Sequence, residues 1–109
     1  MIIAVFSKKD LDCNIGGREF YLFDTGMATA YLILRGTELG LVVHPIAGYS
    51  HSKTKEILGI PEEFTVITLL IVGKKTDDTS LLSEKQIASE SKRPPRKAFT
   101  DFVHYNKYG

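Results

Sequence analysis

Residues 40–48 (GLVVHPIAG) form the segment of the chain best suited to bind a ligand. A short apolar strand leads into Pro45, Ile46, Ala47 and Gly48, and a turn of this composition exposes backbone N–H and C=O groups at the end of a strand. Such main-chain groups can recognise a flat heteroaromatic ring by hydrogen bonding. The same residues also fit an ordinary connection between a strand and a helix, and their spacing alone favours this second interpretation.

The other side chains that often carry chemistry form no catalytic constellation in the sequence. The three histidines are His44, His51 and His104. They stand far apart and lack the spacing of metal ligands. Cys13 is the only cysteine, which excludes an intramolecular disulfide and a multi-cysteine metal site. Asp10 and Asp12 flank it, and we expect their charges to raise the pKa of its thiol, which disfavours a redox role.

Phosphate recognition has one candidate region, a late basic cluster of Lys92, Arg93, Arg96 and Lys97. The sequence contains neither GxGxxG nor GKS or GKT, so the two standard phosphate-binding loops are absent from it. The formal net charge is only +1, which gives no overall basic field to attract nucleic acid. The cluster is therefore either an anion contact or a solvated surface patch.

A long helix is the element predicted to precede the 40–48 segment. Asp24 and Thr25 are good N-cap residues, and apolar residues then recur at intervals of three and four positions. This pattern predicts a helix over residues 25–39, with Gly40 as the residue just beyond its C-cap. The helix carries only two charged residues, so it should be buried on most sides. We therefore expect a partner chain in at least a homodimer, with Met27, Tyr31 and Leu34 near the contact.

Three apolar runs predict the strands of a small sheet. They are residues 2–6, 41–43 and 65–72, the first of which we interpret as a central strand that is buried on both faces. Further along the chain, Ser50 and Ser52 can cap a short helix that ends at Leu58 before Gly59. Residues 7–18 are predicted to be a loop, and residues 83–88 a short helical turn.

Length and composition bound the organisation of the chain. With 109 residues it fits one α+β (mixed α/β) domain, in which a small sheet packs on the long helix. We divide residues 1–109 into a core over 1–72, a polar excursion over 73–95 and an aromatic tail over 96–109 that is expected to wrap another surface. No apolar run reaches the length of a signal peptide or a membrane span, and we interpret the chain as cytoplasmic.

Several short motifs, in order and correctly spaced, resemble the C-terminal half of the nitroreductase family. They are Gly17-Arg18-Glu19-Phe20, Asp24-Thr25-Gly26, Leu39-Gly40-Leu41, Pro45-Ile46-Ala47-Gly48, residues 55–62 (KEILGIPE) and residues 102–109 (FVHYNKYG). Each is weak alone, but together they extend over nearly the whole chain. The resemblance implies an incomplete nitroreductase-like fold, and a sheet that begins abruptly at residue 2 also suggests that upstream sequence is missing.

The resemblance further implies a cofactor and a reaction. Members of the family are intertwined homodimers that bind FMN at the interface. They pass hydride from NADH or NADPH through the flavin to nitro compounds, quinones or similar acceptors. The P-I-x-G turn lies along the flavin ring, so the N–H of Ala47 would face its N5 atom, with Pro45, Ile46 and Gly48 framing the ring. A basic residue before the C-terminal motif contacts the FMN phosphate, for which Arg93 and Arg96 are the first candidates and Lys92 and Lys97 the next.

Two departures from the family pattern leave alternatives open. Ala47 stands where an acidic or polar residue is frequent, although a main-chain contact survives this change. The family's N-terminal half, with its own phosphate contacts, has no counterpart in the sequence, so the isolated chain is expected to be inactive. The alternatives are a non-enzymatic remnant that dimerises or binds a ligand, and a flavin-storing or flavin-cleaving relative on the same fold.

Overall fold

The computed structural model of the chain describes residues 1–92 and 94–108. These residues fall into two compact units, Met1–Lys75 and Thr76–Gly109, which are described separately. The first unit contains a three-stranded sheet and two α-helices, and the second contains one α-helix and a short 3₁₀ helix. The mixed α+β class predicted from the sequence is confirmed.

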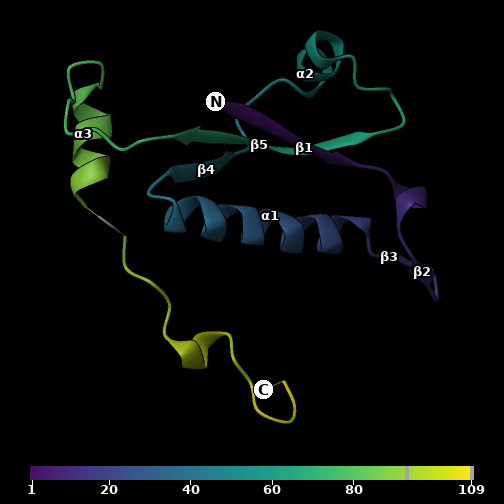
Figure 1. The fold of residues 1–109 in the computed structure, drawn as a ribbon. Coiled ribbons are helices and arrows are strands. Elements are labelled where there is room, and N and C mark those ends of the chain that lie inside the picture. The colour runs from purple at the N-terminus through teal and green to yellow at the C-terminus, as the bar shows by residue number, and fades with distance from the viewer. Residues whose placement is uncertain (93, 109) are drawn as a thin grey trace. The chain divides into compact units, whose positions relative to one another are not determined.

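The sheet of the first unit has the strand order β1-β5-β4, and both pairings are antiparallel (Figure 1). Its strands are β1 (Ile2–Ser7), β4 (Val42–Ile46) and β5 (Thr65–Gly73). The apolar run of β5 makes it the central strand, and Val66 and Leu70 are the most deeply buried side chains of the described chain. The interpretation of the first run as a central strand is wrong. Among the described residues β1 is an edge strand, and Ile2 is 66% exposed.

The long helix, α1 (Tyr21–Glu38), begins four residues earlier than predicted. Asp24 therefore lies in its first turn and does not cap it, because the N-cap position belongs to Phe20, whose carbonyl accepts a bond from the Asp24 N–H. The predicted C-terminus is confirmed. Gly40 adopts φ +73°, and the N–H of Leu41 donates to the Gly36 carbonyl, as in a Schellman motif.

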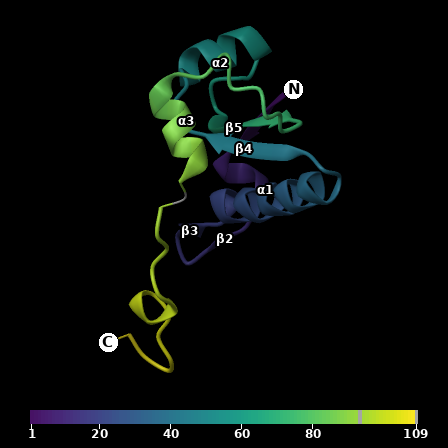
Figure 2. The same cartoon turned by 90° about the vertical axis from the view of Figure 1, so that its left-hand side faces the viewer.

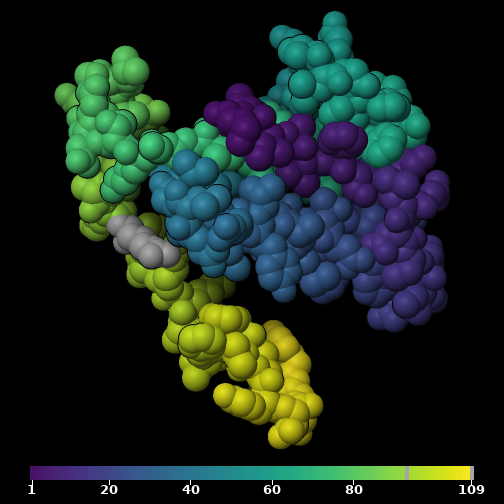
Figure 3. Space-filling model, in the orientation of Figure 1, coloured from purple at the N-terminus to yellow at the C-terminus, as the bar shows by residue number. Residues whose placement is uncertain are grey.

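The helix α1 packs on one face of the sheet and leaves most of its own surface exposed. Figures 1 and 2 show the sheet between α1 on one side and α2 (His51–Leu58) on the other. Only Tyr21 and Gly36 of α1 are buried, whereas Tyr31 and Leu34 are 75% and 61% exposed. The space-filling view shows α1 (blue) at the surface below β1 (purple) (Figure 3). The predicted burial on most sides is therefore not reached within this chain, since the sheet covers only one side of the helix.

The shorter elements follow local rules of turns and caps. Ser50 caps α2 by accepting a bond from the Lys53 N–H, and Gly59 ends it at φ +64°, both as predicted. Residues 7–18 are more ordered than the predicted loop. They contain a 3₁₀ helix (Lys9–Leu11) and the first strand of a hairpin that pairs β2 (Asn14–Ile15) with β3 (Arg18–Glu19). Gly16 and Gly17 form its two-residue turn at φ +60° and +79°, which suits a type I′ turn.

The second unit contains α3 (Glu84–Ser91) and a 3₁₀ helix (Phe99–Asp101). The helical turn predicted at 83–88 is thus an eight-residue helix, capped by Ser83 through a capping box with Gln86. In the tail, the rings of Phe99 and Phe102 stack with centroids 5.6 Å apart. Within the described ranges, no helix combines the length and the apolarity needed to cross a membrane.

Candidate functional site

The candidate ring-binding segment lies where β4 ends. Pro45 and Ile46 belong to the strand and pair in register with Leu70 and Leu69 of β5. The prediction that the turn starts at Pro45 is therefore wrong. Proline lacks an N–H to donate, but an edge strand tolerates it, and β4 is at the edge of the described sheet. The connection out of the strand consists of Ala47 and Gly48, which we call the open turn.

Two side-chain hydrogen bonds continue the contact between β4 and β5 where the strand pairing stops. The Thr68 hydroxyl of β5 donates to the carbonyl of Ile46, the last residue of β4, at 2.9 Å. In the opposite direction, the Tyr49 hydroxyl donates to the Val66 carbonyl of β5 at 3.1 Å. Both bonds are partly buried, and burial raises the pKa of Tyr49. The open turn is therefore tied to the central strand on both sides.

The open turn itself presents backbone to solvent. Ala47 and Gly48 are exposed, and the one bond across the turn runs from the Tyr49 N–H to the Ala47 carbonyl at 3.0 Å. In the described part of the chain, the N–H groups of Ala47 and Gly48 appear in no turn or side-chain hydrogen bond. A Cβ built on Gly48 would meet no atom within 4 Å, so the space beside the turn is open. These two N–H groups can therefore donate to an acceptor on a planar ligand.

The histidines do not converge on this segment as a catalytic group. His44 is exposed on β4, and His51 packs its ring on that of Tyr49, with centroids 4.5 Å apart. His104 packs on Tyr108 in the tail. Among residues 1–92 and 94–108, no three His, Cys, Asp or Glu side chains are grouped so as to hold a metal ion.

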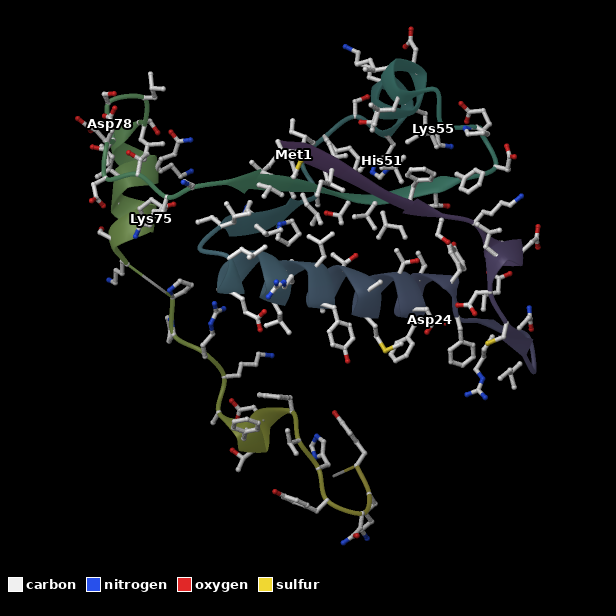
Figure 4. All side chains as sticks on the ribbon, in the orientation of Figure 1. Met1, Asp24, His51, Lys55, Lys75 and Asp78 are labelled. Atoms are coloured by element: carbon white, nitrogen blue, oxygen red, sulfur yellow. The ribbon has the colours of Figure 1, made fainter. Side chains whose placement is uncertain are left out.

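Cys13 lies beside two carboxyl groups at the start of α1. Partial desolvation of its thiol, followed by the charges of Asp12 and Asp24, raises the pKa of Cys13. The direction predicted from the sequence is confirmed, but Asp24, and not Asp10, is the second carboxylate that acts on it (Figure 4 labels Asp24). The thiol is thus kept protonated, which disfavours nucleophilic chemistry.

The basic residues proposed to contact phosphate lie in the second unit or outside the described residues. Arg93 falls outside the residues that the structure describes. Arg96, Lys92 and Lys97 are exposed in the second unit, in the segment that joins α3 to the 3₁₀ helix or at its border. The structure brings Pro45, Ile46, Ala47 and Gly48 together as one segment of the first unit. The basic candidates remain a separate group.

Three residues that shape the site were not identified from the sequence. Thr68 is a polar residue within an apolar strand, and Tyr49 directly follows the open turn, so both carried a weak signal. Gly36 carried none, because its role depends on a contact between distant elements. A Cβ built on it would overlap the Cγ2 methyl of Val43, so glycine is what allows α1 to approach β4.

The comparisons with known proteins agree on one family. The family model described as the nitroreductase family matches residues 1–74. No curated protein sequence matches the chain. Among solved structures, a nitroreductase family protein from Clostridium novyi NT is 30% identical over 70% of this chain and 43% of that chain, with a TM-score of 0.64.

Two further solved structures share the fold at lower identity. An oxidoreductase containing FMN is 23% identical over 99% of this chain and 55% of that chain, with a TM-score of 0.80. Iodotyrosine deiodinase bound to FMN and 3-iodo-L-tyrosine is 21% identical over 98% of this chain and 47% of that chain, with a TM-score of 0.64. The chain thus spans about half the length of these relatives. The antiparallel sheet carries the P-I-x-G segment at the end of β4. Because the family model also matches about two thirds of its residues, the chain belongs to the nitroreductase family.

Proposed function

We propose that the chain supplies the ring-facing part of an FMN site in an oxidoreductase. The observation that carries this proposal is the open turn in a chain of the nitroreductase family: its two N–H groups take part in none of the turn or side-chain hydrogen bonds of the described residues, and the space beside Gly48 is open. The fold shared with structures that contain FMN supports it. The substrates we propose are NADH or NADPH as hydride donor and a nitro compound, a quinone or a similar acceptor.

Each part of the site has a distinct role in this proposal. Bound FMN would supply the hydride-accepting and hydride-donating chemistry. The N–H of Ala47 would donate to the ring at N5, and Pro45, Ile46 and Gly48 would frame the ring. Arg93 or Arg96 would contact the phosphate, for which the planar fork of arginine is well suited.

The affinity of this chain for FMN is expected to be weak, because half of the length of the relatives has no counterpart in it. A charge-assisted hydrogen bond contributes roughly 1.5–3 kcal/mol. The loss of two such bonds weakens binding by about two to four decades, since about 1.4 kcal/mol corresponds to tenfold. Titration by NMR detects such weak binding, because it follows the backbone N–H resonances directly.

The test is a titration of the ¹⁵N-labelled chain with FMN and, in parallel, with riboflavin, which has the same ring but no phosphate. We expect both ligands to shift the Ala47 and Gly48 resonances. The double variant Arg93→Ala, Arg96→Ala should weaken FMN binding and leave riboflavin binding unchanged. Absence of any shift at millimolar flavin would contradict the proposed function. Tight stoichiometric binding would contradict the account of the missing contacts.

We also propose that the chain forms a homodimer through the exposed face of α1. Met27, Tyr31 and Leu34 are 44%, 75% and 61% exposed on that face. Burial of a large aliphatic side chain contributes about 1.5–3 kcal/mol, which favours covering these residues. Sedimentation should show a dimer at micromolar concentration and a monomer for Leu34→Lys. A stable monomer of the unmodified chain would contradict this proposal.

The same exposed face supports the second candidate, a non-enzymatic dimerisation or ligand-binding remnant of the fold. Flavin binding distinguishes the two, because a remnant would dimerise without shifting the Ala47 and Gly48 resonances in the titration. Oxidation of NADH or NADPH in the presence of FMN and a quinone then distinguishes an oxidoreductase from a relative that only stores or cleaves flavin. We expect the isolated chain to show little of this activity.

A further inference from the structure

The open turn lies at the point where the regular pairing between β4 and β5 ends. The last paired residues are Ile46 on β4 and Leu69 on β5. The pairing of β5 with β1 is also irregular at this level. Val5 and Phe6 are consecutive in β1, but they pair with Thr68 and Val66, so one residue of β5 between these two has no partner. Without further contacts, backbone polar groups would lose their ladder partners there.

The hydroxyl groups of Thr68 and Tyr49 supply further contacts at this level. Thr68, on β5, donates to the carbonyl that ends β4, and Tyr49, just beyond the turn, donates back to the Val66 carbonyl of β5. Each bond thus joins a side chain of one segment to the backbone of the other. The two bonds enclose the open turn between them, so the chain can leave the sheet there while both ends of the turn stay fixed.

Beyond Tyr49 the chain is fixed again at once. Ser50 caps α2 through the Lys53 N–H, and its carbonyl accepts bonds from the N–H and the hydroxyl of Thr54. The ring of Tyr49 packs on that of His51. Among the turn and side-chain hydrogen bonds of the described residues, Ala47 and Gly48 take part only in the one that the Ala47 carbonyl accepts from the Tyr49 N–H, so the geometry of the open turn depends on the bonds at either side.

We propose that Tyr49 and Thr68 are positioning residues that hold the open turn in the geometry in which its N–H groups meet the flavin ring. This inference rests on the proposed function. A group that is held in its binding geometry before the ligand arrives loses less conformational freedom on binding. Tyr49 and Thr68 themselves make no contact with the ligand in this proposal, and act through the backbone of the turn.

The test uses substitutions that remove one hydroxyl and little else. Tyr49→Phe and Thr68→Val should each speed hydrogen exchange of the Tyr49 N–H and weaken the binding of FMN and riboflavin by roughly two- to tenfold, the range of one neutral hydrogen bond. Thr68→Ser keeps the donor and should restore both properties. The matched controls are Thr65→Val in the same strand and Tyr105→Phe, because Thr65 and Tyr105 are exposed.

A purely structural role would lower the global free energy of unfolding and speed exchange along all of β5. The positioning role predicts faster exchange of the bonded Tyr49 N–H without a general rise along β5, with rescue by Thr68→Ser. The inference is overturned by unchanged exchange of the Tyr49 N–H, by exchange that rises equally along β5, or by faster exchange of the Tyr49 N–H with unchanged flavin affinity. If flavin shifts no resonance of the unmodified chain, the proposed function fails and the flavin part of the inference fails with it. The exchange data then still decide whether the two bonds hold the turn.

Discussion

Replacement of Gly36 by alanine tests how α1 is fitted against the strand that carries the open turn. The residue is buried in α1, and a Cβ at this position would overlap the Cγ2 methyl of Val43 on β4. Helix propensity alone would favour alanine over glycine by about 0.5–1 kcal/mol. An extra carbon in a packed contact costs about 1–3 kcal/mol. We therefore expect Gly36→Ala to lower the free energy of unfolding by up to about 2 kcal/mol.

Gly26→Ala is the matched control, because Gly26 lies in the same helix and a Cβ there would meet no atom within 4 Å. It should raise the free energy of unfolding by about 0.5–1 kcal/mol through propensity alone. The propensity gain is common to both variants, so their difference isolates the contact with Val43 at about 1–3 kcal/mol. Adding Val43→Ala to Gly36→Ala removes the obstructing methyl groups and should reveal coupling between the two positions.

Urea unfolding measures these differences. For a small domain the slope is about 1–3 kcal/mol per molar urea, so the midpoints of the two glycine variants should differ by about 1 M. The Gly36→Ala variant should also perturb the amide resonances of the open turn, because Val43 lies in β4, the strand that leads into the turn. If Gly36→Ala stabilises the chain as much as Gly26→Ala does, the close packing of α1 on β4 is wrong.

Two further predictions concern charged groups of the first unit. Asp24→Asn should lower the raised pKa of Cys13 and speed its alkylation at pH 8, whereas Asp10→Asn should leave the rate unchanged; equal rates for both variants would contradict the assignment of Asp24. The Lys55 ammonium donates to the Glu62 carbonyl at 2.8 Å and pairs with the Glu62 carboxylate at 3.2 Å (Figure 4 labels Lys55). Urea unfolding should show a loss below about 1 kcal/mol for Glu62→Gln, because the Glu62 carboxylate is exposed to solvent. Lys55→Met should cost more, because it also removes the bond to the Glu62 carbonyl.

The elements with strong local signals could be predicted from the sequence. The continuous apolar run over residues 65–72 predicted strand β5, and Ser50 and Gly59 marked the two ends of α2. Gly40 marked the end of α1 correctly. In each case the signal is local, because capping, left-handed glycine and a fully buried strand depend on residues within a few positions of one another.

The errors arose where tertiary context decides between local options. Pro45 suggests a turn, but an edge strand accommodates it, and whether β4 is at an edge depends on the sheet order. The hairpin around Gly16 and Gly17 has strands of only two residues, too short for any alternation to show. Asp24 resembles a cap, yet the helix continues past it to Tyr21, which is buried in the first unit.

For the candidate site, too, local sequence signals were informative and long-range contacts could not be predicted. The sequence indicated which backbone segment could face a ring, because Pro, Ile, Ala and Gly in that order are compatible with a ligand-reading turn. It could not indicate what holds that segment, because the Tyr49 and Thr68 bonds cross 17 and 22 residues of chain. A threonine within an apolar strand raises the question of where its hydroxyl bonds, and here the answer is the carbonyl at the end of β4. The polar exceptions in buried strands therefore deserve examination first when a main-chain binding site is sought, since each must find a partner and that partner is frequently the backbone of a neighbouring turn.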